Sequence, residues 1–456
     1  MKKLLTISLC IAMVICSFLL ISCGNTEGEI TINGHSLKDF KIVIPEEADL
    51  ITEYAAENLA LLVKEKTDID LAVIRDSEEE ADCEILIGNT NRAMSSKFEG
   101  ELADGEYLLF AKGGKIVCQG SGVYVGGACG ELVNTHIMSA MKPDGSAKVR
   151  SLSKTPEALK FVFPEKYTSV IFMIGDGMGF QHVKMFEKNK SMTFVGNMFP
   201  VSAKSVTRSL SVMKGEAGYT DSAASATAMA TGFKTLNQRL GVDENGATLL
   251  NIRELAHQKG AKTAVITTDI VTGATPSAYL VHHNSRYDTE IIQAQIDALL
   301  TNNEIDYLAA DVNNELTNKL AEALALISKD SDFFIMLEEA MIDKTSDDQD
   351  IWGTIRNVTR FNDAVAYASQ FVMCHPNVAL IVTADHETGK LTPYPALGPG
   401  FMFESYSHTN YDVPVYALGA GVGVLNGKKL ENTELAQFAA KAFSNESFGA
   451  TYEPVE

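Results

Sequence analysis

The chain of 456 residues is poor in basic side chains relative to acidic ones. Lys and Arg number 38 against 59 Asp and Glu, which gives a formal net charge of −21. Because nucleic-acid phosphates are bound through basic surfaces, this balance argues against a nucleic-acid partner. It does not exclude a small anionic substrate, because bound metal ions can reverse the sign of the charge at one site.

Cysteine is also scarce in the body of the chain. Of the seven cysteines, Cys10, Cys16 and Cys23 lie near the N-terminus, and the other four are Cys83, Cys118, Cys129 and Cys374. Their spacing contains no C-x-x-C pair, which excludes a dense disulfide framework. Cys118 and Cys129 could form a disulfide or could remain buried free thiols.

Long apolar runs are lacking except at the N-terminus. Met1-Lys2-Lys3 precedes an apolar stretch over 4–21, the pattern of a secretory signal, and Leu20-Ile21-Ser22-Cys23-Gly24 resembles a bacterial lipobox. We therefore expect a lipoprotein signal peptide over 1–22, lipid attachment at Cys23 and a polar tether over 23–28. An uncleaved membrane anchor is the alternative. Either reading predicts an exported protein anchored at the cell envelope, without a polytopic membrane domain.

The remaining chain divides into two predicted α/β parts. Residues 29–151 read as a small accessory domain, with a strand near 40–44, an amphipathic helix over 50–67 and a Gly-rich stretch over 120–130. This part loosely resembles the accessory domains that precede catalytic domains in some bacterial carbohydrate-acting enzymes. We expect a linker over 152–166 and a catalytic domain over 167–456.

In the second part, apolar strands alternate with helical segments. The expected strands are 170–174, 264–267, 333–337, 378–382 and 413–417, and the expected helices are 250–259, 317–328, 354–374 and 434–443. Continuous apolar strands of this kind are buried on both faces of a sheet. The alternation predicts an α/β fold in which a central, mostly parallel sheet forms a three-layer α/β/α sandwich.

Ser222 is the most informative single residue. It follows Asp221 and precedes a run of small residues, Ala223 to Thr227, that could form a tightly packed helix. A serine at a helix start lies in a field that favours negative charge, because the first backbone N–H groups are unpaired. The pair could also be no more than a helix cap.

Acidic and imidazole side chains follow the ends of the predicted strands. The positions are Asp176 in the Gly175-to-Gly179 loop, Glu338 and Asp343, the pair Asp385-His386, and His408 just before the last strand. Sites in open α/β sheets assemble at the carboxyl ends of the strands. Carboxylates gathered there repel one another unless cations are bound, so the pattern predicts a metal centre.

These motifs and their order resemble the alkaline phosphatase family. The stretches that carry the resemblance are 174–179, 220–231, 274–276, 285–286, 343–344, 383–388 and 408–409. On this resemblance, Ser222 is the nucleophile that becomes phosphoserine, and Arg286 clamps the phosphoryl oxygens. A guanidinium fork suits that task better than an ammonium group.

The resemblance further implies two zinc sites and one magnesium site. The implied ligands are Asp176, Asp385 and His386 for the zinc that deprotonates the serine; Asp176, Thr275 and Glu338 for magnesium; and Asp343 and His408 for the other zinc. The second zinc would hold the leaving group and then the attacking water. A metal pair of this kind stabilises both oxygens of an in-line displacement. A homodimer is implied by resemblance only.

The chain departs from the family at the second zinc site. A histidine is usual four residues after the first aspartate, but Asp347 occupies that place, and Asp348 follows it. A carboxylate can bind zinc, but two carboxylates leave the ion without net positive charge and favour magnesium or manganese. Asp347 is therefore either a substitute ligand or a solvated residue beside a weak or empty site.

A second departure is Gly273, where relatives often carry Asp or His near the magnesium. Glycine there removes an outer group but no direct ligand. Lys344, beside Asp343, matches the bacterial pattern and could hold phosphate through water.

We expect a metal-dependent enzyme that hydrolyses small phosphate monoesters. Two alternatives stay open: a phosphodiesterase-type hydrolase of the same superfamily, and a degenerate, non-catalytic phosphate-binding lipoprotein. A sulfatase is disfavoured, because no Cys/Ser-x-Pro-x-Arg motif occurs.

Overall fold

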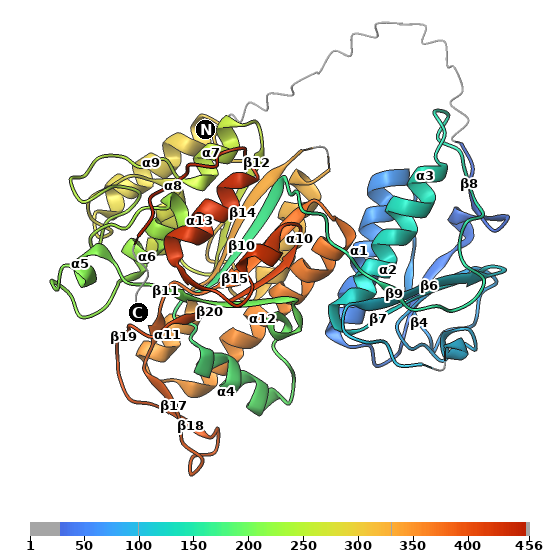
Figure 1. Cartoon of the computed structure of the whole chain (residues 1–456), viewed down its shortest axis with the longest axis horizontal. Coiled ribbons are helices and arrows are strands. Elements are labelled where there is room, and N and C mark those ends of the chain that lie inside the picture. Colours follow the sequence, from blue (N-terminus) through green and yellow to red (C-terminus); the bar gives the residue numbers. More distant parts are fainter. Residues whose placement is uncertain (1–27, 99, 330, 453–456) are drawn as a thin grey trace, which may run out of the picture.

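The computed structural model describes residues 28–98, 100–329 and 331–452, which form two α/β parts side by side (Figure 1). The predicted signal peptide, Cys23 and the tether up to residue 27 lie outside the described residues. Within the described ranges, no helix combines the length and the apolar character needed to cross a membrane.

The larger part is built on an eight-stranded sheet with the order β13-β12-β14-β10-β15-β20-β11-β21. Its strands are β10 (Ser169–Gly175), β11 (Val201–Val206), β12 (Lys262–Thr267), β13 (Tyr307–Ala309), β14 (Phe333–Glu339), β15 (Val378–Thr383), β20 (Val413–Gly419) and β21 (Lys429–Glu431). The five strands from β13 to β15 run parallel, whereas β20 is antiparallel to both of its neighbours.

Helices cover both faces of this sheet (Figure 1). They are α4 (Phe180–Lys190), α5 (Leu210–Met213), α6 (Ser222–Thr231), α7 (Ile252–Gln258), α8 (Ala274–Leu280), α9 (Thr289–Thr301), α10 (Leu316–Ile327), α11 (Met341–Asp347), α12 (Ile351–Cys374) and α13 (Asn432–Lys441). Alternate side chains of β10 enter two separate cores. Ile171 belongs to a core that also contains residues of α4, α10 and α12, and Phe172 belongs to a core that also contains residues of α6, α7, α8, α9 and α13. The predicted three-layer sandwich is confirmed.

The direction of β20 determines which residues meet at the carboxyl edge of the sheet. Because β20 is antiparallel to β15, its beginning lies at the edge where the parallel strands end. His408, five residues before β20, is thereby brought to that edge. It lies in β19 (His408–Thr409), which pairs with β16 (Glu387–Thr388), and a second small ribbon joins β17 (Leu391–Pro393) to β18 (Phe401–Phe403).

The smaller part contains a three-stranded sheet, β2-β1-β8, and a six-stranded sheet, β4-β3-β5-β7-β6-β9. Its elements are β1 (Ile30–Ile32), β2 (His35–Ser36), β3 (Lys41–Ile44), α1 (Leu50–Thr67), β4 (Val73–Arg75), β5 (Glu84–Ile87), β6 (Glu106–Lys112), β7 (Lys115–Gly120), α2 (Val125–Glu131), α3 (Met138–Ala140), β8 (Ala147–Val149) and β9 (Leu159–Lys160). The segment 152–166, expected to be a linker, contributes β9 to this sheet, so pairing continues beyond the expected boundary at residue 151.

Single helical turns connect several of these elements. They are η1 (Leu37–Asp39), η2 (Ser95–Lys97), η3 (Gly122–Tyr124), the π-turn η4 (Leu132–Ile137), η5 (Val195–Met198), η6 (Asn313–Glu315) and η7 (Val422–Leu425).

The Gly-rich stretch lets helix α2 pack closely against α12 of the larger part. A Cβ on Gly130 would lie 2.7 Å from the carbonyl oxygen of Met373, and one on Gly126 would lie 2.5 Å from Oε1 of Gln370. Asn134 Nδ2 then donates to the carbonyl oxygen of Cys374 at 2.8 Å. Helix α12 is therefore enclosed between the sheet and the smaller part.

The four cysteines of the described chain are free and buried. Cys118 and Cys129, which could have formed a disulfide, remain thiols, and the hydrogen bond with Cys118 together with burial raises the pKa of Cys129 well above its usual value.

We predict that Gly130→Val lowers the free energy of unfolding by about 1–3 kcal/mol, because the added methyl groups would overlap backbone atoms of α12 that cannot move away. Chemical denaturation would measure this loss. The matched control is Gly423→Val, because a Cβ on Gly423 would meet nothing within 4 Å. Equal stabilities for the two variants would contradict a tight interface.

Candidate active site

Ser222 is the first residue of helix α6, as the sequence indicated. Asp221 caps the helix: its Oδ1 accepts a hydrogen bond from Ala224 N at 3.0 Å. All ten residues of α6 are buried, and their small side chains let the helix pack closely against its neighbours. The hydroxyl of Ser222 therefore lies at the N-terminus of a tightly packed helix. The unpaired backbone N–H groups there stabilise an anionic oxygen.

The loop after β10 contains glycines because other elements approach it closely. Gly177 has a φ of +77°, and a Cβ there would lie 2.9 Å from Cα of Asp343. A Cβ on Gly179 would lie 2.4 Å from Cγ of Glu387. Gly177 N also donates to Asp385 Oδ1 at 3.1 Å, so this loop fixes Asp176 and Asp385 relative to each other.

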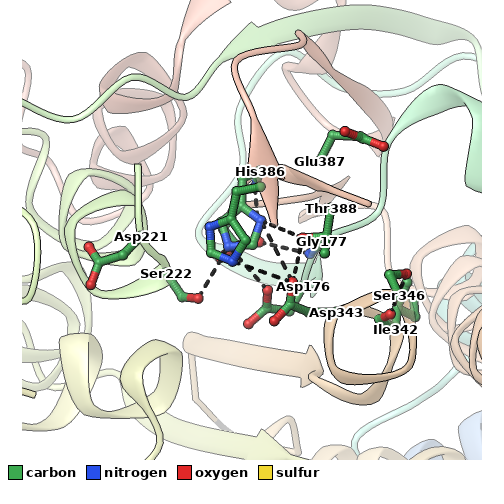
Figure 2. A network of polar contacts seen from close by, with 12 residues as sticks. Asp176, Gly177, Asp221, Ser222, Ile342, Asp343, Ser346, His386, Glu387 and Thr388 are labelled. Carbon is green, nitrogen blue, oxygen red and sulfur yellow. Dashed lines mark hydrogen bonds and ion pairs between the residues drawn. The ribbon is translucent and has the colours of Figure 1, made fainter. Parts of the chain in front are cut away.

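Three oxygen atoms converge on one ring nitrogen of His386, and Figure 2 shows the contacts from Ser222 and Asp176. His386 Nε2 lies 3.2 Å from Ser222 Oγ, 3.5 Å from Asp176 Oδ1 and 3.1 Å from Asp385 Oδ2. A Ser–His–Asp triad would instead place the carboxylate on the opposite ring nitrogen. The two carboxylate oxygens and the imidazole nitrogen are instead grouped as the ligands of one metal ion are.

The donor set fits a divalent ion. Asp176 Oδ1 and Asp385 Oδ2 are buried, and apart from their ion-pair contacts with His386 Nε2 neither atom has a hydrogen-bond partner among the described residues. Single ligand atoms of Asp176, Asp385 and His386 lie within 4.8 Å of one another. Two carboxylates and an imidazole beside a serine are a donor set that can bind a divalent ion such as zinc.

A second cluster lies on the other side of His386. Asp343 Oδ1 is 3.6 Å from His408 Nε2 and 4.0 Å from His386 Nδ1, and the two imidazole rings stack with centroids 3.5 Å apart. His408 Nδ1 donates to the carbonyl oxygen of Thr220 at 2.8 Å, which turns Nε2 toward Asp343. This cluster also fits a divalent ion.

Asp347 is the last residue of α11, one turn after Asp343, so both side chains lie on the same side of that helix. Burial and the neighbouring charge of Asp343 raise the pKa of Asp347 to about 6. Its buried Oδ1 has no hydrogen-bond partner among the described residues, although it lies outside the two three-residue clusters. The carboxylate is thus beside the second cluster and available to it.

The implied magnesium ligands are brought together next to the first cluster. Thr275 Oγ1 lies 3.5 Å from Asp176 Oδ2. Glu338 is 1% exposed and accepts a short hydrogen bond from Thr267 Oγ1. It lies close enough to Asp385 that, besides burial, the charge of Asp385 raises the pKa of Glu338.

The two cations expected to bind phosphate are each paired with an aspartate. Arg286 Nη1 is 3.4 Å from Asp221 Oδ2, directly beside Ser222. Lys344 Nζ forms an ion pair with Asp269, which follows β12.

Burial and mutual repulsion control protonation at this edge. Burial and the charge of Asp385 raise the pKa of Asp176 well above its usual value, and burial raises that of Glu338 to about 8. Burial opposes a charge on His386, but Asp385 and Asp343 outweigh it and raise the pKa to about 9.

A family model described as "Alkaline phosphatase" matches residues 167–315 and 298–403, together just over half of the chain. The chain belongs to the alkaline phosphatase family.

Curated relatives are similar to part of the chain. The chain is 29% identical to Alkaline phosphatase 4 of Bacillus subtilis over 286 residues, which cover 49% of this chain and 62% of that protein. It is 37% identical over 131 residues to the Streptomycin-6-phosphate phosphatase of Streptomyces griseus, which cover 27% of this chain and 28% of that one. The chain therefore spans less than two thirds of the length of these relatives.

Solved structures share the fold of the larger part. The alkaline phosphatase of the Antarctic bacterium TAB5 is 25% identical, with a TM-score of 0.56 over 61% of this chain and 99% of that chain. A point variant of that enzyme has Mg bound in its M3 site. A cold-active alkaline phosphatase from Shewanella sp. gives a TM-score of 0.54 at 22% identity, which shows the fold alone.

Sequence reasoning missed residues that hold the ligands in place. Thr388 Oγ1 donates to Asp343 and lies 3.1 Å from His386 Nδ1. Thr388 belongs to the 383–388 motif, but the motif alone does not indicate this role. His182 is fully buried, accepts from Gly179 N through Nδ1 and donates through Nε2 to Ser346 Oγ of α11. It thereby ties the Asp176 loop to the helix that carries Asp343. Nothing local in the sequence indicates this role.

We predict that the metal-free protein loses stability as the pH rises from about 5 to about 9. In the folded protein the pKa of Glu338 is about 8 and the pKa of His386 is about 9. In the unfolded chain the corresponding pKa values are 4.5 and 6.5. Stability from a raised pKa is complete below the unfolded value and is lost as the pH passes the folded value. Thermal unfolding after chelation would measure this slope.

The control for this titration is Glu338→Gln, which should reduce the pH slope of the metal-free protein. Zinc and magnesium should also abolish most of the slope, because ligation keeps the carboxylates ionised. A metal-free protein that becomes more stable over this pH range would contradict the assignment.

Proposed function

We propose that the protein hydrolyses phosphate monoesters through a phosphoserine intermediate on Ser222. The observation that carries the proposal is the convergence of Ser222 Oγ, Asp176 Oδ1 and Asp385 Oδ2 around His386 Nε2. A serine at a helix start, next to a site suited to a divalent ion, is arranged for attack on an electrophile that carries negative charge.

The proposed reaction has two displacements at phosphorus. Ser222 Oγ forms a bond to phosphorus while the bond from phosphorus to the alcohol oxygen breaks, and the alcohol leaves. Water then attacks the phosphoserine, releases inorganic phosphate and restores the serine. The N–H groups at the start of α6 would stabilise the anionic oxygens, and Arg286, which pairs with Asp221 next to the serine in the chain, would bind the phosphoryl group.

We assign the cofactors to the two clusters and to Glu338. Zinc would be held by Asp176, Asp385 and His386; a second divalent ion by Asp343 and His408, with Asp347 beside them; and magnesium by Asp176, Thr275 and Glu338. Such ions lower the pKa of an oxygen nucleophile and offset the charge of the transferred phosphoryl group. The chain's own residues position the ions, the serine and the arginine.

The proposal also includes location and partners. We propose that the protein is an exported lipoprotein of the cell envelope, attached through Cys23, that acts on small phosphomonoesters, and that it forms a homodimer as the family resemblance implies. Labelling with radioactive palmitate, which Cys23→Ser should prevent, tests the attachment.

Ser222→Ala should reduce phosphate release from an aryl phosphate to the level of the blank, because the oxygen that attacks phosphorus is removed. The zinc- and magnesium-loaded full chain is assayed, and acid-quenched wild-type protein is examined by mass spectrometry for phosphate on the Ser222 peptide. Ser202→Ala, at an exposed position of β11, is the control and should keep full activity. Unchanged activity in Ser222→Ala would contradict the mechanism.

We predict that Asp347→His raises the affinity for zinc about tenfold and also raises turnover. The reason is that an imidazole in place of a carboxylate restores net positive charge to the second ion. Zinc content after dialysis and steady-state rates measure the two effects. Asp348→His is the matched control, since Asp348 is exposed. An unchanged or lower rate would mean that the site is adapted to the carboxylate.

The same metal-loaded protein also distinguishes the proposed enzyme from a non-catalytic phosphate-binding protein. Fewer than two tightly bound transition ions, together with phosphate binding and no turnover, would favour the non-catalytic lipoprotein.

A further inference from the structure

The smaller part of the chain has a cavity of about 830 Å³ at one edge of its six-stranded sheet. Strands β4, β3, β5 and β7 of this sheet run parallel, so their carboxyl ends lie along a single edge. Pro45 follows β3, Asn89 lies just after β5, and Gly120 is the last residue of β7; all three line the cavity. The cavity therefore lies outside the carboxyl ends of three neighbouring parallel strands.

The strand order places this cavity where such sheets bind ligands. From β3 the chain crosses through α1 to β4 on one side of β3, and the next strand, β5, lies on the other side. In open α/β sheets, ligands bind outside the carboxyl ends of the strands at this point of reversal. Met198, in η5 of the larger part, also lines the cavity, so the cavity lies between the two parts. Its volume falls within the range of about 300–1,000 Å³ that small-molecule sites have.

Gln119 presents a hydrogen-bond acceptor to the cavity. The residue is 7% exposed, and its Nε2 donates to the carbonyl oxygens of Gly88 at 3.1 Å and Ser95 at 3.0 Å and to Asn89 Oδ1 at 2.9 Å. Because three oxygens surround Nε2, the orientation of the amide group is determined. No described residue donates to Oε1 of Gln119, so this oxygen is left for a ligand in the cavity that the residue lines.

Two further uncharged side chains of the lining have unused hydrogen-bonding groups. Thr52 of α1 is 9% exposed, and its backbone N donates to Asp49 Oδ1 at 2.7 Å, but its hydroxyl has no partner among the described residues. Asn89 accepts from Gln119 through Oδ1, and its Nδ2 has no partner within the described chain. The cavity thus offers an amide oxygen, an amide nitrogen and a hydroxyl group.

The charged side chains around the cavity are acidic. Glu47, Asp49 and Glu101 line it, and no Lys, Arg or His is among the described residues of the lining. Phosphates and carboxylates are bound through cationic groups, so this lining disfavours an anionic ligand. The acids also do not form a metal site, because both groups of potential metal ligands in the described chain lie at the active site. The ligand that fits is uncharged and rich in hydroxyl groups.

We propose that this cavity binds a neutral carbohydrate. Sugar hydroxyls both donate and accept hydrogen bonds, so they can donate to Gln119 Oε1 and accept from Asn89 Nδ2. Ile51 and Val125 also line the cavity and offer apolar surface to the C–H groups of a sugar ring. The inference does not depend on the proposed function, because none of these residues belongs to the phosphatase site. It gives the smaller part a binding role, in which it holds the protein on a glycan.

Saturation-transfer-difference NMR on the zinc- and magnesium-loaded full chain tests this proposal. The probes are glucose, galactose, mannose, N-acetylglucosamine, cellobiose and N,N′-diacetylchitobiose. We expect at least one of them to receive saturation from the protein and to give a Kd on titration. Inorganic phosphate, added to occupy the proposed phosphatase site, should leave that Kd unchanged.

Two variants locate the bound sugar. Thr52→Val removes a hydroxyl that has no protein partner, and Asn89→Ala removes the free amide nitrogen. Each should raise the Kd about threefold to tenfold, the size of one neutral hydrogen bond, and should leave phosphatase activity unchanged. Thr155→Val, at an exposed position outside the lining, is the matched control and should leave the Kd unchanged. Melting temperatures of the three variants show that each one is folded.

The outcomes separate this inference from the proposed function. A protein that binds none of the six sugars would overturn the carbohydrate site, and so would a Kd that stays the same in both Thr52→Val and Asn89→Ala. A sugar that inorganic phosphate displaces would be bound at the phosphatase site, which also contradicts the assignment. A wild-type protein without phosphatase activity would overturn the proposed function and leave the carbohydrate site standing.

Discussion

The burial of several carboxylates at one edge of the central sheet is the constraint on which the rest of the structure depends. Asp176, Glu338 and Asp385 are 6%, 1% and 0% exposed, and their charges repel one another. Buried charges are costly unless they are paired. In the protein alone, raised pKa values and the protonated His386 relieve part of the repulsion. Divalent ions would offset the remaining repulsion and would make the same residues useful to a neighbouring serine.

The surrounding fold keeps these acids close despite their repulsion. Gly177 and Gly179 let α11 and Glu387 approach the Asp176 loop, and His182 ties that loop to α11 through Ser346. Behind the sheet, α12 is enclosed by the smaller part of the chain. This enclosure gives the smaller part a structural role, because it covers the helix that supports β10 and β15.

The elements that could be predicted from the sequence were those with strong local patterns. The apolar strand at β10 and the amphipathic helix α1 lie where periodicity indicated, and Ser222 begins a helix because Asp221 caps it and small residues follow. Prediction was weakest where a residue's role depends on a distant partner. Gly273 looked like the loss of an outer group, but the side chain of Asp269 occupies its space. The 152–166 segment looked like a linker because β9 is only two residues long.

The sequence by itself determined which chemical groups are available: a serine after a capping aspartate, acids and imidazoles next to strand ends, and an aspartate where a histidine is usual. These are properties of residue type and short-range order, which are written in the chain directly. Only the tertiary structure decided which atoms face one another. It placed two carboxylates and Ser222 on the same nitrogen of His386, which distinguishes a metal centre from a catalytic triad, and it paired Lys344 with Asp269. The direction of β20 and the packing of α11 produce these contacts, and both depend on interactions between segments far apart in the chain.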